Sequence, residues 1–191
     1  MPITINGNGT IGGISVGGLP DGTVDTDTIA DAAVTAAKRG AGAILQVVEG
    51  NTSTEVSNST TTYVDTGLSA TITPISTTSK VLVVVDQQCR YSRTDTFQGV
   101  GVRLYRDATL IYDPISIATG PFDDYVNLAG VTSVFRDLTV NLHVLDSPST
   151  TSAVTYKTQG RPYQTTGNAS FQVATTGVNG SSRIILMEVA A

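Results

Sequence analysis

The sequence is poor in the residues that bind metals and attack substrates: among its 191 residues there are one cysteine, Cys89, and one histidine, His143. A single cysteine cannot form an internal disulfide, and one residue of each kind cannot assemble the usual cysteine–histidine zinc site within one chain. Both lie in apolar stretches typical of β-strands. We therefore predict no metal, no cofactor and no nucleophilic cysteine–histidine pair.

Charged side chains are also scarce, at 14% of the sequence, against about a quarter in typical soluble domains. The formal net charge is −5, which argues against nucleic acid as a partner because nucleic acid recruits basic patches. No run of about 18 apolar residues is present, so no membrane insertion is predicted. The first residues lack the basic start and apolar run of a secretory signal, and we expect synthesis in a cytoplasm.

Two acidic clusters do not reach the pattern of a site. Asp123 and Asp124 follow loop residues, where neighbouring acids are usually solvated. The acids Asp25, Asp27 and Asp31 match part of a calcium loop, but the glycine and the terminal glutamate of that loop are missing. The sequence therefore predicts a protein that is not an enzyme.

What is abundant is glycine, and Gly7, Gly9 and Gly12 have the Gly-x-Gly-x-x-Gly spacing of dinucleotide-binding loops. That loop works only between a buried strand and a helix whose N-terminus faces the pyrophosphate. Only a short apolar stretch precedes these glycines, and the following residues run into Pro20, which stops a helix. The glycines are better interpreted as conformational freedom and close backbone packing.

Residues 1–24 are therefore predicted to form an extended, glycine-rich anchoring arm. Such a segment cannot build its own core, so it orders by pairing with another chain, as a strand added to a partner sheet. A disordered tail is the alternative interpretation. The arm residues assigned to docking on a particle are Ile3, Ile5, Ile11, Ile14 and Val16.

Residues 25–43 carry the signals of a short helical stem. Asp27 or Thr28 can cap the first N–H groups, and Lys38 and Arg39 before Gly40 suit the negative end of a helix. The apolar face is too shallow to hold an isolated helix in water. Copies from neighbouring subunits could pack there through small residues that permit close approach. The candidate contacts are Ile29, Ala33 and Ala36.

Residues 44–191 are predicted to form an antiparallel β-sandwich or jelly-roll head, because short β-type stretches recur between turn residues without a second helical pattern. We expect a hairpin over residues 106–109 and a bend at Gly67. The apolar runs Val81–Val85 and Ile184–Met187 indicate strands buried on both faces, in the sandwich centre or against another subunit. The predicted strands cover residues 44–49, 63–74, 80–91, 98–106, 110–112, 125–135, 138–145, 153–158, 170–175 and 183–189.

The stretch from Asp25 to Gly40, DTDTIADAAVTAAKRG, resembles the stem units of bacteriophage tail-fibre and related virion proteins. The ending from Ser182 to Ala190, SRIILMEVA, is similar to C-terminal strands of small phage structural proteins. The resemblance covers about the first fifth and the last tenth of the chain. It implies a homotrimer that docks on other virion proteins through its N-terminal part and carries a β-sandwich head. Longer fibres repeat the stem unit, and its single copy here implies a short peg.

Two functions remain open for such a virion protein. As a tail fibre, its head would contact a receptor such as a host cell-surface glycan, through aromatic rings that stack on sugars and arginine side chains that bind polar groups. As a capsid cement or decoration protein, it would clamp shell subunits with its arm, and the head loops would be passive. A glycan depolymerase ranks below both. The residues predicted to lie in receptor-contacting loops are Tyr91, Arg93, Phe97, Phe122, Tyr125, Arg161 and Tyr163.

Overall fold

The computed structural model of the chain describes residues 4–5, 11–12, 34–35, 38–93, 97–113, 123–125, 134–164, 167–175 and 178–191. The chain divides into two units, Met1–Arg39 and Gly40–Ala191. In the first unit, strand β1 (Thr4–Ile5) pairs antiparallel with β2 (Ile11–Gly12). Most of the predicted stem helix falls outside the described residues. Residues 34–35 and 38–43 of its range form short turns and bends, with hydrogen bonds from the Lys38 N–H to the Thr35 carbonyl at 3.0 Å and from the Ala43 N–H to the Gly40 carbonyl at 3.1 Å.

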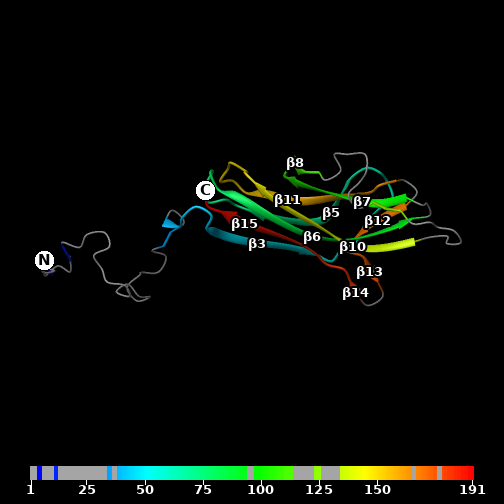
Figure 1. Cartoon of the computed structure of the whole chain (residues 1–191), viewed down its shortest axis with the longest axis horizontal. Helices are drawn as coiled ribbons and strands as arrows, with labels where there is room; N and C mark the ends of the chain where they lie inside the picture. The colour runs from blue at the N-terminus through cyan, green and yellow to red at the C-terminus, as the bar shows by residue number, and fades with distance from the viewer. Residues whose placement is uncertain are drawn as a thin grey trace. The chain divides into compact units, whose positions relative to one another are not determined.

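The second unit is an antiparallel β-sandwich, which confirms the predicted fold class (Figure 1). One sheet contains six strands and the other contains five. The six-stranded sheet runs β3 (Ile44–Thr52), β15 (Ser182–Val189), β6 (Lys80–Arg93), β12 (Gly167–Phe171) and β4 (Val56–Asn58), with β10 (Val134–Asp146) paired to β6. The five-stranded sheet runs β5 (Val64–Ile72), β11 (Val154–Pro162), β7 (Phe97–Arg106) and β8 (Thr109–Tyr112), with β9 (Asp123–Tyr125) paired to β7. A small separate ladder joins β13 (Ala174–Thr175) to β14 (Val178–Asn179).

Strand β6 is the centre of the larger sheet. It pairs with β10 along 13 residues, and with β15 and then β12 along its other edge. Its side chains alternate, because successive residues of a strand point to opposite faces. Val81, Val83 and Val85 are fully buried, whereas Leu82 and Val84 are half-buried on the outer face. The prediction that this run is buried on both faces in the sandwich centre is therefore wrong, and burial of its outer face against another subunit stays a prediction.

The same correction applies to β15. Ile184 and Leu186 are fully buried between the sheets, and Ile185 and Met187 are half-buried outside. The core that these strands close is built from Val, Leu and Ile side chains of both sheets. The β-branched residues suit this packing because they fit the pleated surface of a strand.

Two predicted turns are confirmed. Asp107 has φ +50° in the tight connection between β7 and β8, and an aspartate tolerates this left-handed conformation. Gly67 has φ +84° within β5, where the register with β11 shifts between Lys157 and Gln159. The strand bends there and stays in its sheet.

Several strands differ from the predicted ones. Strand β10 runs unbroken from Val134 to Asp146, although a break was expected before Leu138. Strand β4 was not expected, because its three residues are too short to show a period. Strand β12 ends at Phe171, and Gln172 leaves it with φ +54°.

A polar cluster lies inside the sandwich. The Gln87 carbonyl oxygen Oε1 accepts hydrogen bonds from the hydroxyls of Thr66 at 3.1 Å and Thr158 at 2.7 Å. Its amide Nε2 donates to the Ser182 hydroxyl at 2.9 Å. All four residues are fully buried. Because buried polar groups are costly unless they are paired, this cluster fixes how the two sheets align.

Candidate functional site

The outer face of the five-stranded sheet carries a stack of tyrosine and arginine side chains. The guanidinium carbon of Arg103 lies 3.9 Å from the centroid of the Tyr63 ring and 4.9 Å from that of Tyr105. The guanidinium carbon of Arg161 lies 4.9 Å from the Tyr63 centroid. Such contacts are attractive because the faces of aromatic rings carry negative charge.

Strand alternation explains why these side chains share one face. Arg103 and Tyr105 are two residues apart in β7, and Lys157, Gln159 and Arg161 alternate in β11. The register places Gln159 opposite Arg103 and Lys157 opposite Tyr105. It also places Gln159 opposite Asp65 of β5. We call this surface the tyrosine–arginine face, and its residues are Tyr63, Asp65, Arg103, Tyr105, Lys157, Gln159 and Arg161.

Hydrogen bonds hold the polar groups of this face in order. The Asp65 carboxylate accepts from Lys157 Nζ at 2.8 Å and from Gln159 Nε2 at 2.6 Å. The Gln159 Oε1 in turn accepts from Nε and Nη2 of Arg103, at 3.1 and 2.7 Å. The amide of Gln159 thus links the carboxylate of one strand to the guanidinium of another.

The pKa values of two groups on this face, Asp65 and Tyr63, are shifted away from neutral pH. Burial alone would raise the pKa of Asp65, but the hydrogen bonds from Lys157 and Gln159 outweigh it and lower that pKa. Burial raises the pKa of Tyr63 despite the nearby arginines. Asp65 is therefore a carboxylate and Tyr63 a neutral phenol, so these two residues offer a hydrogen-bond acceptor and an uncharged ring.

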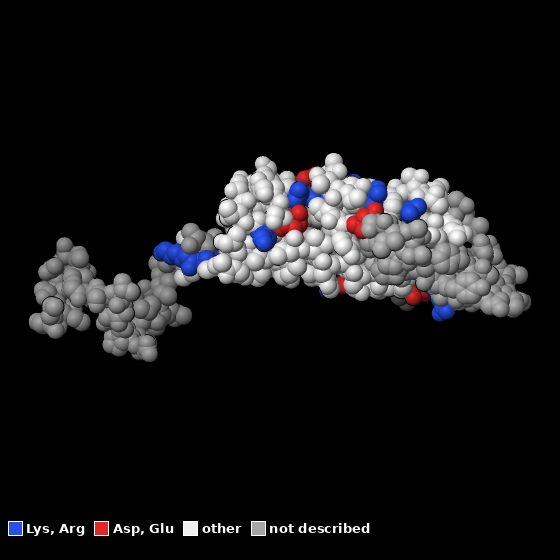
Figure 2. Space-filling view, turned by 45° about the horizontal axis from the view of Figure 1, so that its top comes forward, with Lys and Arg blue, Asp and Glu red and all other residues white. Residues whose placement is uncertain are grey.

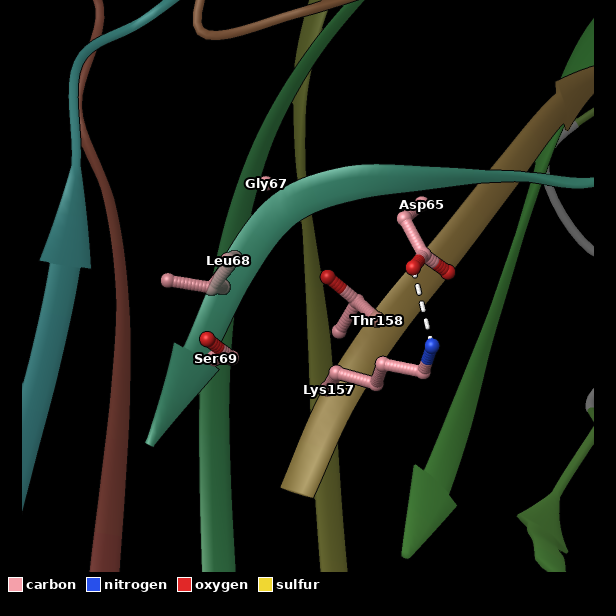
Figure 3. A pocket seen from close by; sticks show the side chains of 6 residues that line it. All are labelled: Asp65, Gly67, Leu68, Ser69, Lys157 and Thr158. Atoms are coloured by element: carbon pink, nitrogen blue, oxygen red, sulfur yellow. Dashed lines mark hydrogen bonds and ion pairs between the residues drawn. The ribbon is translucent and has the colours of Figure 1, made fainter. Parts of the chain in front are cut away.

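A shallow pocket opens beside this face at the bend of β5. It has a volume of about 80 Å³ and is lined by Asp65, Gly67, Leu68, Ser69, Lys157 and Thr158. Figure 3 shows Asp65 and Lys157 approaching each other from β5 and β11, with Ser69 on the opposite side. The pocket is smaller than the sites of drug-sized ligands, which span about 300–1,000 Å³. It suits one small polar unit of a longer ligand.

The structure places the predicted receptor-contact residues unevenly. Arg161 belongs to the tyrosine–arginine face, although it lies in β11 and not in a loop. Tyr163 follows β11, is half-buried, and its N–H donates to the Gly99 carbonyl at 3.0 Å. Tyr91 lies within β6 and is only 3% exposed, so the prediction that it contacts a receptor from a loop is wrong.

The remaining predicted contacts lie beyond what the structure describes. Arg93, Phe97 and Tyr125 belong to β6, β7 and β9, but their side chains are outside the described part. Ile5 and Ile11 lie in β1 and β2, again without described side chains. The other predicted positions fall outside the described residues altogether: Phe122, Ile3, Ile14, Val16, Ile29, Ala33 and Ala36.

Sequence reasoning missed most of the tyrosine–arginine face. The signal was the alternation of polar side chains at positions 157, 159 and 161, which continues the pattern of β11 beyond the predicted end at Thr158. A second signal was the pair Arg103 and Tyr105, which lie two residues apart in the predicted strand 98–106. Neither signal shows which strands are neighbours, and the stack depends on that.

A second surface of interest is apolar. On the outer face of the six-stranded sheet, the register aligns Val47, Met187, Leu82 and Leu145 in one row across four strands. Val47 is 57% exposed and Leu145 is 53% exposed. We call this row the apolar band. On the face that Figure 2 shows, charged side chains are few and gather in small clusters surrounded by uncharged surface.

Among the described residues, no three His, Cys, Asp or Glu side chains cluster so as to hold a metal ion. None of the described helices is long and apolar enough to cross a membrane.

No protein-family model matches the chain, and no curated protein matches it. Among solved structures, the chain is similar to dimeric latent PorU from Porphyromonas gingivalis, with 12% identity and a TM-score of 0.33. The match covers 79% of this chain but only 14% of that chain.

Proposed function

We propose that this chain is a structural protein of a bacteriophage virion, a short homotrimeric tail fibre whose sandwich head binds glycan on the host surface. The tyrosine–arginine face is the observation that carries the proposed binding. It combines aromatic rings, an ordered carboxylate and amide, and two guanidinium groups on one sheet face. Sugars are recognised by this combination, because rings stack on their C–H faces while polar groups pair with their hydroxyls.

The proposed place in a virion and the three-fold association rest on the stem-like stretch from Asp25 to Gly40 and on the arm before it. In this proposal the arm docks on other virion proteins, and the head has no catalytic role. The sandwich supplies a rigid sheet. Binding side chains on its strands are held more precisely than side chains on loops would be.

A capsid cement or decoration protein is the second candidate, and the apolar band favours it. Its apolar side chains are aligned across four strands, exposed at Val47 and Leu145 and half-buried between them, and they offer a surface for packing against a shell subunit. The copy number of the protein per particle separates the two candidates. A few trimers on a tail supports the fibre, and copies over the whole shell support decoration.

The binding proposal is tested by Arg103→Ala in the full-length protein. The change removes the guanidinium between two rings and both hydrogen bonds to Gln159. We expect binding to host cells to weaken by about tenfold or more, as at the centre of other interfaces. The measurement is a titration of labelled protein on cells, with and without purified surface glycan as competitor.

The matched control is Arg183→Ala, because Arg183 is an exposed arginine on the other sheet, paired with Glu49 at 2.9 Å. It removes the same charge and should leave binding unchanged. Equal binding by the wild type and the Arg103 variant would remove the tyrosine–arginine face from the proposed function.

A further inference from the structure

The strands at the edges of the two sheets differ in how well they are protected. An edge strand exposes unpaired backbone N–H and C=O groups, and proteins usually blunt it with short length, a bulge or close cover. Among the described residues, β10 pairs only with β6, so its second edge has no partner strand. This edge belongs to a 13-residue strand.

Every other described edge of the sandwich is blunted. Strands β4 and β9 have three residues each and β8 has four. Strand β5 is bent at Gly67, and the ladder of β3 with β15 shifts register next to Val189. The face of β3 also lies close against β5, because a Cβ placed on Gly50 would lie 2.1 Å from the Ser69 carbonyl oxygen.

Strand β10 has none of these features. All 13 of its residues pair with β6 without a register shift, and the sequence from Val134 to Asp146 contains no proline. Large apolar side chains are exposed near both of its ends, with Phe135 at 64% and Leu145 at 53%. A long, regular edge with exposed apolar ends is a template for pairing with another strand.

We infer that this edge pairs with β10 of a second copy of the chain, antiparallel and around a two-fold axis at Val140. Full overlap of residues 134–146 with themselves fixes that centre, because Val140 is the middle residue of the strand. Directly opposite residues then point to the same face of one continuous sheet. A two-fold axis requires such self-complementarity, since each contact occurs twice.

The outer face of β10 is self-complementary in this register. Phe135 lies opposite Leu145 of the second copy, so the two exposed apolar ends cover each other. Asp137 lies opposite His143 of the second copy, and Thr139 lies opposite Asn141. All six side chains are exposed in the single chain: Phe135, Asp137, Thr139, Asn141, His143 and Leu145.

The partners of Asp137 and Phe135 favour this register over the registers shifted by two residues. Asp137 receives two hydrogen bonds from Arg90 at 2.6 and 2.9 Å, yet its side chain is still 58% exposed and open to a second donor. A slip of two residues would place Asp137 opposite Asn141 or Leu145 and would leave Phe135 without an apolar partner. The side-chain pairs therefore select the register that also gives the longest ladder.

The inference does not depend on the proposed function, because it uses only residues of the sandwich. Two-fold pairing of heads would join two trimers if the arm and stem segments, residues 1–43, also associate as a trimer. It would give a simple dimer if they do not. In both cases the number of chains in the soluble assembly is even.

A pair of lysine substitutions tests the interface in the full-length protein. Thr139→Lys with Asn141→Lys places four positive charges around the two-fold axis, and lysines on an edge strand oppose pairing. We expect the number of chains per assembly, measured by light scattering or sedimentation, to halve, with a dissociation constant at least about tenfold higher. The control, Asn51→Lys with Ser53→Lys, alters two exposed positions at the end of β3 and should keep the wild-type mass.

A cysteine experiment tests the register. Chains carrying Thr139→Cys are mixed with chains carrying Asn141→Cys, while native Cys89 is fully buried and stays out of reach. Directly opposite residues lie about 4.5–5.5 Å apart between their Cα atoms, which a disulfide can span, whereas diagonal neighbours lie about 7–8 Å apart. We expect cross-linked pairs in the mixture at least about tenfold faster than in either variant alone.

Each outcome decides the inference. An even number of chains, halved by the lysine pair and trapped by the mixed cysteines, supports it. A wild type that stays at one or three chains up to its solubility limit overturns it, and so does an even assembly that the lysine pair leaves intact. Three chains would at the same time support the proposed homotrimer, so an experiment can contradict the two-fold pairing of β10 without contradicting the homotrimer.

Discussion

At the scale of single residues, Glu188 is the buried acid that the fold has to satisfy. It is fully buried near the end of β15, where its carboxylate accepts from Gln46 Nε2 at 2.6 Å and from the Ile75 N–H at 2.8 Å. Burial alone would raise the pKa of Glu188, but these hydrogen bonds outweigh it and lower that pKa. The carboxylate therefore ties β3 and the segment after β5 to the end of β15.

The sign of the resulting pH dependence follows from this direction. A carboxyl whose pKa is lower in the folded state stabilises the fold above its unfolded-state pKa, about 4.3 for glutamate. That contribution is lost as the pH falls through the folded-state pKa. Glu188→Gln should lower the free energy of unfolding by about 1–3 kcal/mol at pH 7. It should lower it by less at pH 3, because the stabilisation by the wild-type carboxylate declines once the pH is below the unfolded-state pKa.

Urea unfolding at the two pH values measures this effect. The control is Glu49→Gln, because Glu49 and Arg183 form an exposed ion pair of the kind that contributes about 0–1 kcal/mol. A Glu188 variant as stable as the control at pH 7 would contradict the structural role assigned to the carboxylate.

At the scale of elements, the two sheets approach closely where β11 faces β12. A Cβ placed on Gly160 would lie 2.1 Å from Cζ of the Phe171 ring, which is fully buried. The ring occupies the space that a side chain at position 160 would need. Gly160 is thus required for packing, and its backbone has no positive φ that would demand glycine on its own account.

Gly160→Ala should therefore destabilise the sandwich by about 1–3 kcal/mol, the usual cost of adding volume to a filled core. The comparison is Gly40→Ala, where a Cβ meets no atom within 4 Å. Denaturant unfolding of both variants measures the difference. If the two variants have the same stability, the ring moves aside at little cost and the contact is not rigid.

The sequence predicted elements well where they alternate and poorly where neighbours decide. The pattern of valines in β6 and of isoleucine and leucine in β15 located the central strands, and Gly67 located a bend. The sequence does not show that Tyr91 faces inward, because burial depends on which face the other sheet covers. The tyrosine–arginine face was missed for the same reason: Tyr63, Arg103 and Arg161 come from three segments, and only the register brings them together.

At the scale of the whole molecule, the sandwich contains its own core. Every residue of the buried cluster lies between Leu68 and Leu186, within the second unit. Hydrogen bonds between Gly42 and Ala190, at 2.8 Å, and between Ala190 and Ala43, at 2.9 Å, join the start and the end of this unit. Residues 1–39 contribute nothing to the described core, so the head should fold without them.

Removal of residues 1–39 tests this independence and the proposed anchoring arm together. We expect the shortened chain to unfold in one cooperative transition, with a free energy of unfolding within about 1 kcal/mol of the full-length value. We also expect it to stay out of virus particles, whereas the full-length Arg103→Ala variant should join them normally. Loss of cooperative unfolding would contradict the division into two units. Normal incorporation of the shortened chain would instead show that the sandwich, and not the arm, docks on the particle. The apolar band would then be the candidate docking surface, because it has exposed apolar side chains.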